Sequence, residues 1–309
     1  MSPTNRSTDA MVSRPVTRDD RPAPRPDARR RGRRARRWVI ALVVLVLLLV
    51  GADFGAAAYA EHMISQKART QLQLNDDPSV TIHGFPFLTQ ALGGDYSHIS
   101  VSAAGIPVAD KLQDVAVNAE LENVKAPLSD LANGNTKAIT IGELTGSVTI
   151  KAADLARVSP LDKIKDLRIE PSSTAYVKNG DAGQSEPTPT TTKTTEGQAD
   201  QDESSTGVRI SGHLSFAGRD LEIFCFAMIE ADAKGGTINF IPKRLQFGNN
   251  QETTVVPQAV QNALMPNFRA SITTKDLPLS VTPTGVQVRS GSVTIKGKAA
   301  NVSFADLSK

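Results

Sequence analysis

The chain has 309 residues, 39% hydrophobic and 22% charged, which is enough apolar material for one large folded domain with a core. Its net charge of +3 is unevenly divided, because residues 1–37 hold twelve Arg and four Asp, a net of +8, and the remainder therefore carries −5. Since the positive charge belongs to the tail, a pI near 9.0 does not indicate a nucleic-acid-binding domain.

Residues 1–37 are rich in Arg, Pro, Asp, Ser and Thr. A segment of this composition cannot bury enough apolar surface to offset the entropy of ordering, so we predict a disordered basic tail. Its last part, residues 29–37, is an arginine cluster that adjoins an apolar run beginning at Trp38. Arginines beside an apolar run hold that end on the cytoplasmic side of a membrane. A nucleic-acid-binding arm is the competing interpretation, and the adjoining apolar run disfavours it.

Residues 38–60 are predicted to be an export element. They include only one charged side chain, Asp53, and 23 residues are long enough for a helix to cross a bilayer. The shorter uninterrupted run, 38–52, also fits a signal peptide, and Ala58-Tyr59-Ala60 resembles a small-x-small cleavage site. Two interpretations therefore stay open, a retained membrane anchor and a signal segment cleaved after Ala60. Both place the rest of the chain, residues 61–309, on the extracytoplasmic side, bound to the cytoplasmic membrane or released into the periplasmic space.

An amphipathic helix is predicted to follow, over residues 61–74. Its apolar side chains fall on one stripe at helical spacing, which consists of Ala60, Met63, Ile64, Ala68 and Leu72. The sequence Asn75-Asp76-Asp77-Pro78 is expected to end the helix. Such a helix needs an apolar surface to lie against.

Most of residues 61–309 shows the alternation of apolar and polar side chains that is typical of strands. This pattern occurs around residues 80–82, 99–101, 115–121, 208–216, 286–288, 293–295 and 302–304. Many such segments predict a large antiparallel sheet with one covered face. Short helical segments are expected at 127–132, 152–157 and 257–264, so the predicted class is α+β and strand-dominated.

Residues 179–206 break the strand pattern. Their Gly, Ser, Thr, Pro, Gln, Asp and Glu content predicts a disordered, solvated insert. It is either a linker between two domains or a long loop within one, and the similar strands on both sides favour the loop. Threonine-rich tracts of this kind can carry sugars in exported proteins.

One hexapeptide, Gly-Ser-Val-Thr-Ile-Lys, occurs at residues 146–151 and again at 291–296. A duplicated half would produce such a repeat. The flanking residues do not match, which favours chance reuse of common strand sequence.

Catalytic motifs are missing from the sequence. The four histidines, His62, His83, His98 and His213, have no metal-ligand spacing, and no nucleophile elbow or phosphate-binding loop occurs. The single cysteine, Cys225, lies in an apolar run and is predicted to be a buried, unreactive thiol. We therefore expect a protein that is not an enzyme and that carries no metal or cofactor.

The most distinctive local feature is the apolar corner around residues 80–96. Pro86 is incompatible with a regular central strand, so Phe85, Phe87 and Leu88 are expected to form a kinked corner. This corner either plugs one end of the sheet core or serves as a pocket lip or membrane-contact wedge.

The same segment resembles the LmeA-like phospholipid-binding envelope proteins of actinobacteria. The resemblance rests mainly on Gly-Phe-Pro-Phe-Leu-Thr-Gln at residues 84–90, followed by Leu92, Gly94 and Tyr96, and less specifically on Pro127-Leu128-Ser129-Asp130-Leu131 and Leu277-Pro278-Leu279. It covers roughly residues 55–306 apart from the insert. Membership would imply a tubular-lipid-binding-like fold, with a long curved antiparallel sheet wrapped around an amphipathic helix and an apolar groove between them. The insert and the arginine-rich tail depart from the family pattern.

The resemblance leads us to expect non-enzymatic binding or transfer of a phospholipid, or a related acyl lipid, in the cell envelope. The cytoplasmic membrane and envelope proteins are expected partners, and nucleic acid is not. Eight apolar residues are candidates for lining the groove: Phe85, Phe87, Leu88, Val101, Leu121, Leu214, Phe216 and Phe240. The alternative function is a structural or interaction protein with a filled core that docks envelope enzymes or cell-wall polymers.

Overall fold

A computed structural model describes residues 28–72, 74–108, 112–127, 130, 135–159, 161–179, 204–216, 218–249, 252–274, 281–303 and 305. The chain divides into two compact units, Met1–Leu49 and Val50–Lys309, which we describe separately. Most of the predicted tail and most of the predicted insert lie outside the described residues.

The first helix, α1 (Ala28–Leu72), is longer than predicted at its N-terminal end. Residues 28–37, which we expected to be disordered, are helical, because Arg and Ala are strong helix formers and here continue an apolar helical run. The part from Ala35 to Thr70 is long and apolar enough to cross a membrane. The helix ends at Leu72, just before the predicted stop.

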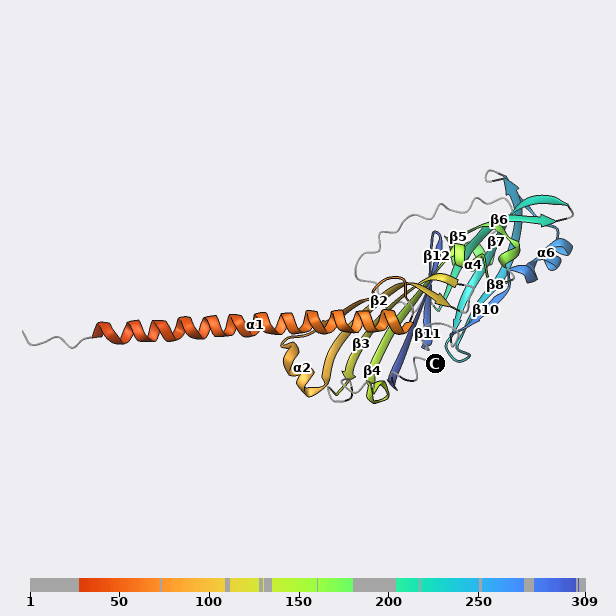
Figure 1. Ribbon diagram of the computed structural model, residues 1–309. Helices are drawn as coiled ribbons and strands as arrows, with labels where there is room; N and C mark the ends of the chain where they lie inside the picture. Colours follow the sequence, from red (N-terminus) through yellow and green to blue (C-terminus); the bar gives the residue numbers. More distant parts are fainter. Residues whose placement is uncertain are drawn as a thin grey trace, which may run out of the picture. The chain divides into compact units, whose positions relative to one another are not determined.

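Two antiparallel sheets form the unit from Val50 onward (Figure 1). The first has the order β1-β2-β3-β4-β12-β11. Its strands are β1 (Ser79–His83), β2 (Asp95–Val108), β3 (Leu112–Lys125), β4 (Thr140–Lys151), β11 (Thr282–Arg289) and β12 (Ser292–Ser303).

The second sheet has the order β10-β8-β7-β6-β5, and a short strand, β9 (Glu252–Val255), pairs with β8. Its other strands are β5 (Lys165–Ser172), β6 (Ser205–Phe216), β7 (Arg219–Asp232), β8 (Thr237–Asn249) and β10 (Ala270–Thr273). The strand-dominated α+β class and the curled antiparallel sheet are thus confirmed.

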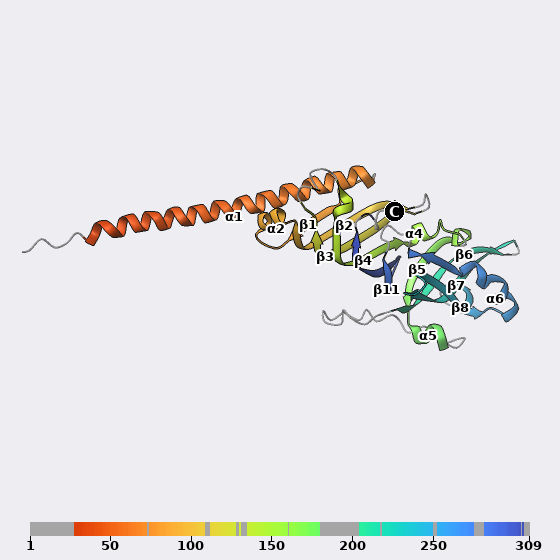
Figure 2. The same cartoon turned by 90° about the horizontal axis from the view of Figure 1, so that it is seen from below.

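The short helices lie in the connections between strands (Figure 2). They are α2 (Phe87–Gly93), α4 (Ala152–Leu155), α5 (Thr174–Asn179) and α6 (Gln258–Leu264), with single 3-10 turns η1 (Thr136–Ala138), η2 (Leu161–Lys163) and η3 (Met265–Phe268). The helices predicted at 152–157 and 257–264 are confirmed, whereas most of 127–132 lies outside the described residues.

Both sheets share one large core. Val148, Ile150 and Val293 of the first sheet pack in the same cluster as Ile210 and Ile238 of the second, all 2% exposed or less. The alternation predicted from the sequence explains this, because every second side chain of a strand faces the same side. A smaller, separate cluster lies under α1 and contains Ile82, Phe87, Tyr96, Ala119, Val124, Ala126, Ile141, Leu144 and Val281.

The two copies of the repeated hexapeptide lie side by side. β4 and β12 pair so that Val148 faces Ile295 and Ile150 faces Val293. Between them, the hydroxyl groups of Thr149 and Thr294 are 2.9 Å apart and form a hydrogen bond. The repeat therefore supplies two neighbouring strands of one sheet.

Both ends of the predicted insert, residues 179–206, belong to regular elements, so the prediction of disorder was wrong at those positions. Asn179 is the last residue of α5, and Ser205 is the first residue of β6. The two strands nearest the insert, β5 and β6, pair with each other, with Ile169 opposite Ile210.

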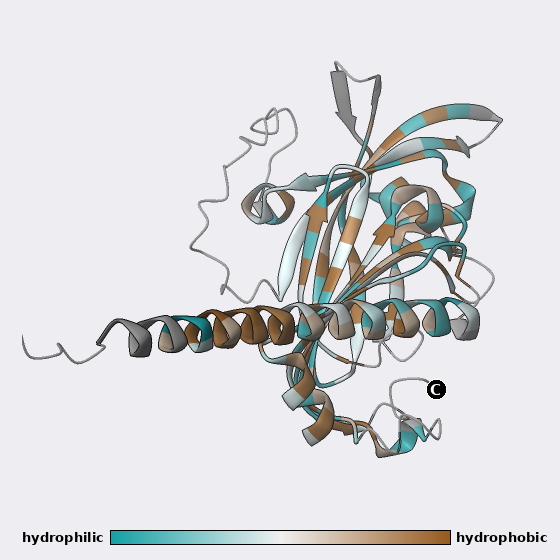
Figure 3. Ribbon diagram, turned by 60° about the vertical axis from the view of Figure 1, so that its left-hand side comes forward, coloured by the Kyte–Doolittle hydropathy of each residue, from teal (hydrophilic) through white to brown (hydrophobic). Residues whose placement is uncertain are grey.

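The prediction of the apolar stripe on the helix was wrong at two positions. Met63 and Ile64 are 38% and 43% exposed. The face of α1 that turns inward is instead made of small and polar residues at helical spacing: Asp53, Ala56, Ala57, Ala60, Glu61, Ser65 and Ala68. Small side chains allow the helix backbone to approach the sheet closely, and this favours alanine over larger apolar residues. Figure 3 shows this part of α1 lying across the strands.

Candidate functional site

Three polar side chains of α1 bind it to the start of the first sheet. The carboxylate of Glu61 accepts a hydrogen bond from the backbone N–H of Ile82 at 2.7 Å. The hydroxyl of Ser65, which is 8% exposed, donates to the backbone carbonyl of Pro78 at 2.5 Å. Because β1 is an edge strand, these bonds satisfy backbone groups that no neighbouring strand could reach.

Asp53 makes the third of these contacts and is the most deeply buried of the three, at 4% exposed. Its carboxylate accepts hydrogen bonds from the backbone N–H groups of Phe87 at 2.8 Å and Leu88 at 2.7 Å. These are the first two residues of α2, whose N-terminal N–H groups have no partner within the helix. The preceding residue, Pro86, provides no side-chain cap, so a carboxylate from another helix takes that role.

The predicted apolar corner is divided between the interior and the surface. Phe87 is 7% exposed and packs in the smaller core cluster, with its ring 6.5 Å from that of Tyr96. Phe85 and Leu88 face outward, at 61% and 40% exposed. The ring of Phe85 stacks on Phe54 of α1, with ring centroids 6.0 Å apart.

Val101 and Leu121 lie on the face of the first sheet that carries the smaller cluster. Both are half-buried, as is Ile99, which faces Leu121 in the pairing of β2 with β3. We call these three residues the apolar floor. Ala56, Ala57 and Ala60 of α1 pack against the same cluster, so helix and floor belong to one layer of contacts.

The other predicted lining residues lie elsewhere. Leu214 and Phe240, at 8% and 2% exposed, belong to the large core shared by the two sheets. Phe240 also borders a hollow of about 500 Å³ beside β8 and β10. Phe216 is the last residue of β6, and its side chain lies outside the described residues. The other seven candidates thus fall into an outward pair, the floor and two packed cores.

A second hollow, of about 490 Å³, lies at the corner itself. It is lined by Gly84, Phe85, Gln90, Asp95, Tyr96, Ser97, Asn123, Val124 and Lys125. Phe85, Tyr96 and Val124 provide an apolar wall, and the other side chains form a polar rim. Burial raises the pKa of the Tyr96 hydroxyl above its ordinary value of 10.0. A hollow of this size is in the range of small-ligand sites.

The family described as LmeA-like phospholipid-binding matches residues 51–298, most of the chain. The protein belongs to this family. The resemblance carried by Gly-Phe-Pro-Phe-Leu-Thr-Gln is thereby confirmed. The chain gave no significant match among functionally described proteins or among solved structures.

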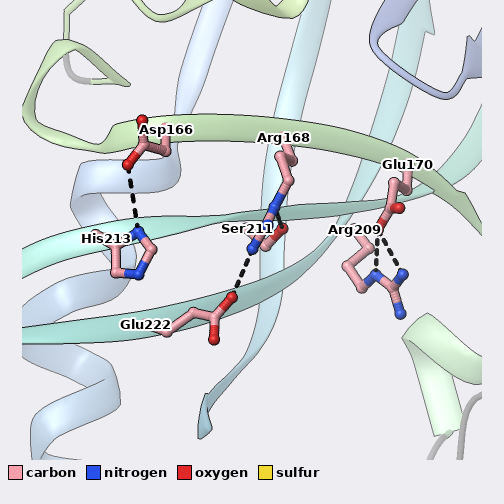
Figure 4. Close-up of polar contacts among 7 residues, drawn as sticks. All are labelled: Asp166, Arg168, Glu170, Arg209, Ser211, His213 and Glu222. Carbon is pink, nitrogen blue, oxygen red and sulfur yellow. Dashed lines mark hydrogen bonds and ion pairs between the residues drawn. The ribbon is translucent and has the colours of Figure 1, made fainter. Parts of the chain in front are cut away.

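In this LmeA-like protein, charged side chains gather on the outer face of the second sheet (Figure 4). Arg168 reaches Glu222 at 2.5 Å, and Arg209 reaches Glu170 at 2.5 Å. His213 lies 3.6 Å from Asp166. The Arg209–Glu170 and His213–Asp166 pairs join the neighbouring strands β5 and β6, whereas the Arg168–Glu222 pair reaches across β6 from β5 to β7. Side-chain pairs of this kind stabilise a sheet modestly.

A histidine pair lies on the first sheet of the LmeA-like fold, and the sequence spacing did not reveal it. His83 of β1 stacks on His98 of β2, with ring centroids 4.4 Å apart. His98 is 2.7 Å from the carboxylate of Glu120, to which Ser100 also donates at 2.6 Å. The Ser100 hydrogen bond, followed by those with His98, lowers the pKa of Glu120. Within the described residues, no group of three or more His, Cys, Asp or Glu side chains is placed to hold a metal ion.

Sequence reasoning missed Asp53, Glu61 and Ser65 as the residues that bind α1 to the sheet. Their partners are backbone groups 13 to 35 residues away, which no local pattern identifies. Of these three, Asp53 is the one that the sequence marks out, since it is the only charged residue among residues 38–60.

Proposed function

We propose that this protein binds a phospholipid acyl chain over the apolar floor, beside α1, and moves such lipids in the cell envelope without catalysing a reaction. Membership in the LmeA-like phospholipid-binding family supports a lipid ligand. The proposed position of the lipid rests on one observation, a difference in burial between residues of the first sheet and residues of the second sheet. Floor residues Ile99, Val101 and Leu121 are half-buried, whereas Ile210 and Ile238 of the second sheet are 0% exposed.

The energetics of lipid transfer explain why this contrast matters. Burying one CH₂ group is worth about 0.8 kcal/mol, so a sixteen-carbon chain needs about 13 kcal/mol of apolar contact when it leaves the bilayer. The packed core of the second sheet has no room for such a chain, because its side chains already fill the space between the strands. Of the eight candidate residues, Val101 and Leu121 therefore remain as floor residues that would contact the acyl chain. Phe85 and Leu88 lie at the end of the proposed path of the lipid.

Photo-crosslinking tests the lipid path. The full-length protein is reconstituted in vesicles that contain a phospholipid with a diazirine on its acyl chain, irradiated, digested and analysed by mass spectrometry. We expect labelled peptides from β2 and β3 around Val101 and Leu121. Labels confined to α1 would show contact with surrounding bilayer lipid alone, and would refute the proposal.

A pair of neighbouring substitutions controls this experiment. Val101→Asp places a charge on the floor and is expected to reduce labelling of β2 and β3 strongly. Ser102→Asp is the matched control, because adjacent residues of a strand point to opposite faces and Ser102 is exposed. Equal labelling in the two variants would contradict a lipid path over the floor.

We further propose that residues 38–60 are a retained anchor, with the arginine-rich end in the cytoplasm and the folded domain outside. Asp53 caps α2, and Ala56, Ala57 and Ala60 pack against the smaller core cluster. Cleavage after Ala60 would remove all four contacts and leave the N–H groups of Phe87 and Leu88 without their acceptor. The folded domain would thus begin near Val50 instead of residue 61.

The intact mass of the protein purified from membranes distinguishes the two fates. A retained anchor predicts a chain that includes residues 38–60. A mature chain beginning at Glu61 would refute retention, and would leave the lipid-binding proposal to be decided by crosslinking alone.

The closely packed core of the second sheet supports a second candidate function, the docking of envelope enzymes or cell-wall polymers. Its core residues Cys225, Ala227 and Ile229 are all 0% exposed, as expected of a rigid body that binds through its surface. In vivo crosslinking from an exposed site of the second sheet, such as Lys243, separates the functions. A specific envelope partner together with no lipid label on the floor would favour docking.

A further inference from the structure

The short helix α2 carries apolar side chains on two neighbouring faces. Its inner face, Phe87 and Ala91, packs in or against the smaller core cluster. Its outer face carries Leu88 and Leu92, which are one helical turn apart and are 40% and 80% exposed. Exposed apolar side chains that gather on a surface mark contacts with another apolar surface or with a membrane, so the outer face of α2 is a candidate for such a contact.

The polar side chains of α2 do not cover this outer face. Thr89 donates its hydroxyl hydrogen bond to the backbone carbonyl of Pro86 at 2.8 Å. The amide of Gln90 bonds the backbone carbonyl of His83 at 3.3 Å and accepts from the N–H of Ser97 at 3.1 Å. Both side chains are therefore engaged with nearby backbone, and the leucines form the outer surface of the helix.

Two aromatic rings extend the same surface. Phe54 of α1 and Phe85 of the corner before α2 are 64% and 61% exposed, and their rings stack. Phe54, Phe85, Leu88 and Leu92 together form an exposed apolar surface, which we call the wedge. Asp53 lies next to Phe54 in the chain, but its charge is buried and bonded to α2.

The position of Phe54 in the chain indicates which environment surrounds the wedge. Phe54 follows Ala52, the last residue of the uninterrupted apolar run, by two residues, which is about 3 Å along a helix. Phe54 lies sixteen residues after Trp38, about 24 Å along a helix, and the hydrocarbon core of a bilayer is about 30 Å thick. A helix that enters the bilayer at Trp38, as proposed above, therefore holds Phe54 in the outer leaflet, near the outer boundary of the hydrocarbon region. Aromatic side chains are enriched at that boundary.

We propose that the wedge is seated in the outer leaflet of the membrane that α1 crosses. This inference rests on the proposed retention of the anchor and adds a second membrane contact to it. Phe85 belongs both to the wedge and to the wall of the 490 Å³ hollow, so the corner connects the leaflet to the protein surface. A lipid that leaves the bilayer at this point does not have to cross water to reach the hollow.

Tryptophan fluorescence tests the wedge, because the chain has a single natural tryptophan, Trp38. In a Trp38→Phe background, Phe85→Trp and, separately, Leu92→Trp place a reporter in the wedge. The full-length protein is reconstituted in vesicles of phosphatidylcholine and phosphatidylglycerol, with or without lipids brominated near the headgroup end of the acyl chain. We expect a blue-shifted emission maximum and loss of emission with the brominated lipid at both positions.

A reporter far from the wedge provides the matched control. Asn262→Trp lies on an exposed position of α6, at the opposite end of the strands from α2 in Figure 1, and should be neither shifted nor quenched. Adding Leu88→Asp to Phe85→Trp should restore emission in brominated vesicles. Circular dichroism of each variant verifies that it is folded.

Either of two other outcomes would contradict the proposal that the wedge lies in the outer leaflet. Red-shifted, unquenched emission would mean that the wedge stays in water, and blue-shifted, unquenched emission would mean that protein covers it. Floor labelling with the photoreactive lipid, measured in the same vesicles, is independent of either result. Failure of the wedge and failure of lipid binding are thus distinguishable.

Discussion

The carboxylate of Asp53 and the backbone N–H of Phe87 are 2.8 Å apart, and this hydrogen bond joins α1 to the first residue of α2. One oxygen of the carboxylate bonds Phe87 and the other bonds Leu88. A charged residue in an apolar segment is thereby used as a helix cap, and the segment becomes part of the folded domain. The same contact sets the position of the corner that carries Phe85.

Removal of this carboxylate should destabilise the fold. Asp53→Ala leaves two N–H groups of α2 without an acceptor, and we expect the free energy of unfolding to fall by about 1.5–3 kcal/mol. Denaturant unfolding of the full-length protein in detergent measures the change. Asp77→Ala, which removes the exposed pair with Arg69, is the control and should cost less than about 1 kcal/mol. Equal losses of unfolding free energy in the two variants would show that the hydrogen bonds of Asp53 stabilise the fold no more than an exposed ion pair does.

Adjacent glycines at the end of α2 should respond in opposite ways to alanine. Gly94 has φ +71°, and a Cβ there would lie 2.8 Å from Cα of Pro127, a backbone atom that cannot easily move. We expect Gly94→Ala to destabilise the protein by at least about 1–2 kcal/mol. Nothing lies within 4 Å of a Cβ at Gly93, so Gly93→Ala should be neutral or stabilise the helix by up to about 1 kcal/mol. Thermal unfolding of both variants tests the contrast.

Close packing of α1 predicts a position-dependent effect of enlarging its alanines. Ala60 packs against the smaller core cluster, whereas Ala58 is exposed. Ala60→Leu should lower the free energy of unfolding by about 1–3 kcal/mol because the helix must move away from the sheet. Ala58→Leu should change it little. If both variants unfold like the natural protein, the small residues do not serve packing, and the cleavage-site interpretation of Ala58-Tyr59-Ala60 gains support.

Burial of Cys225 makes stability depend on pH in the alkaline range. The thiol is 0% exposed, and burial raises its pKa above the ordinary value of 9.0. The unfolded chain therefore releases this proton at a lower pH than the folded chain does. Stability is retained below about pH 9 and falls as the pH rises above it, by up to about 1.4 kcal/mol per pH unit.

The slope of unfolding free energy against pH, measured from about pH 7 to about pH 10, tests this effect. Cys225→Ala should reduce the slope above about pH 9, whatever its effect on stability at neutral pH. A maleimide reagent should label the natural protein only as fast as it unfolds. Rapid labelling of the native protein would contradict a buried, protonated thiol.

Local patterns in the sequence were enough to identify many of the strands, the long apolar helix, the helices at 152–157 and 257–264, and the family. They did not identify β5, β8, β9 or β10. Strand alternation, such as that of Val208, Ile210 and Leu214, depends only on neighbouring residues and on which face is buried. The motif at residues 84–90 is likewise contiguous, so it can be read without knowledge of the fold. Burial of Cys225 followed from its apolar neighbours in the same strand.

Only the tertiary structure decided which distant groups meet. The pairing of the repeated hexapeptides, the stack of His83 on His98 and the bond from Asp53 to α2 each join residues far apart in the chain. The inward face of α1 was mispredicted for the same reason: helical periodicity defines the possible faces, but the sheet selects one that admits small and polar side chains. Met63 and Ile64 are outside because the edge of β1 offers backbone hydrogen bonds there, to Glu61 and Ser65, instead of an apolar surface.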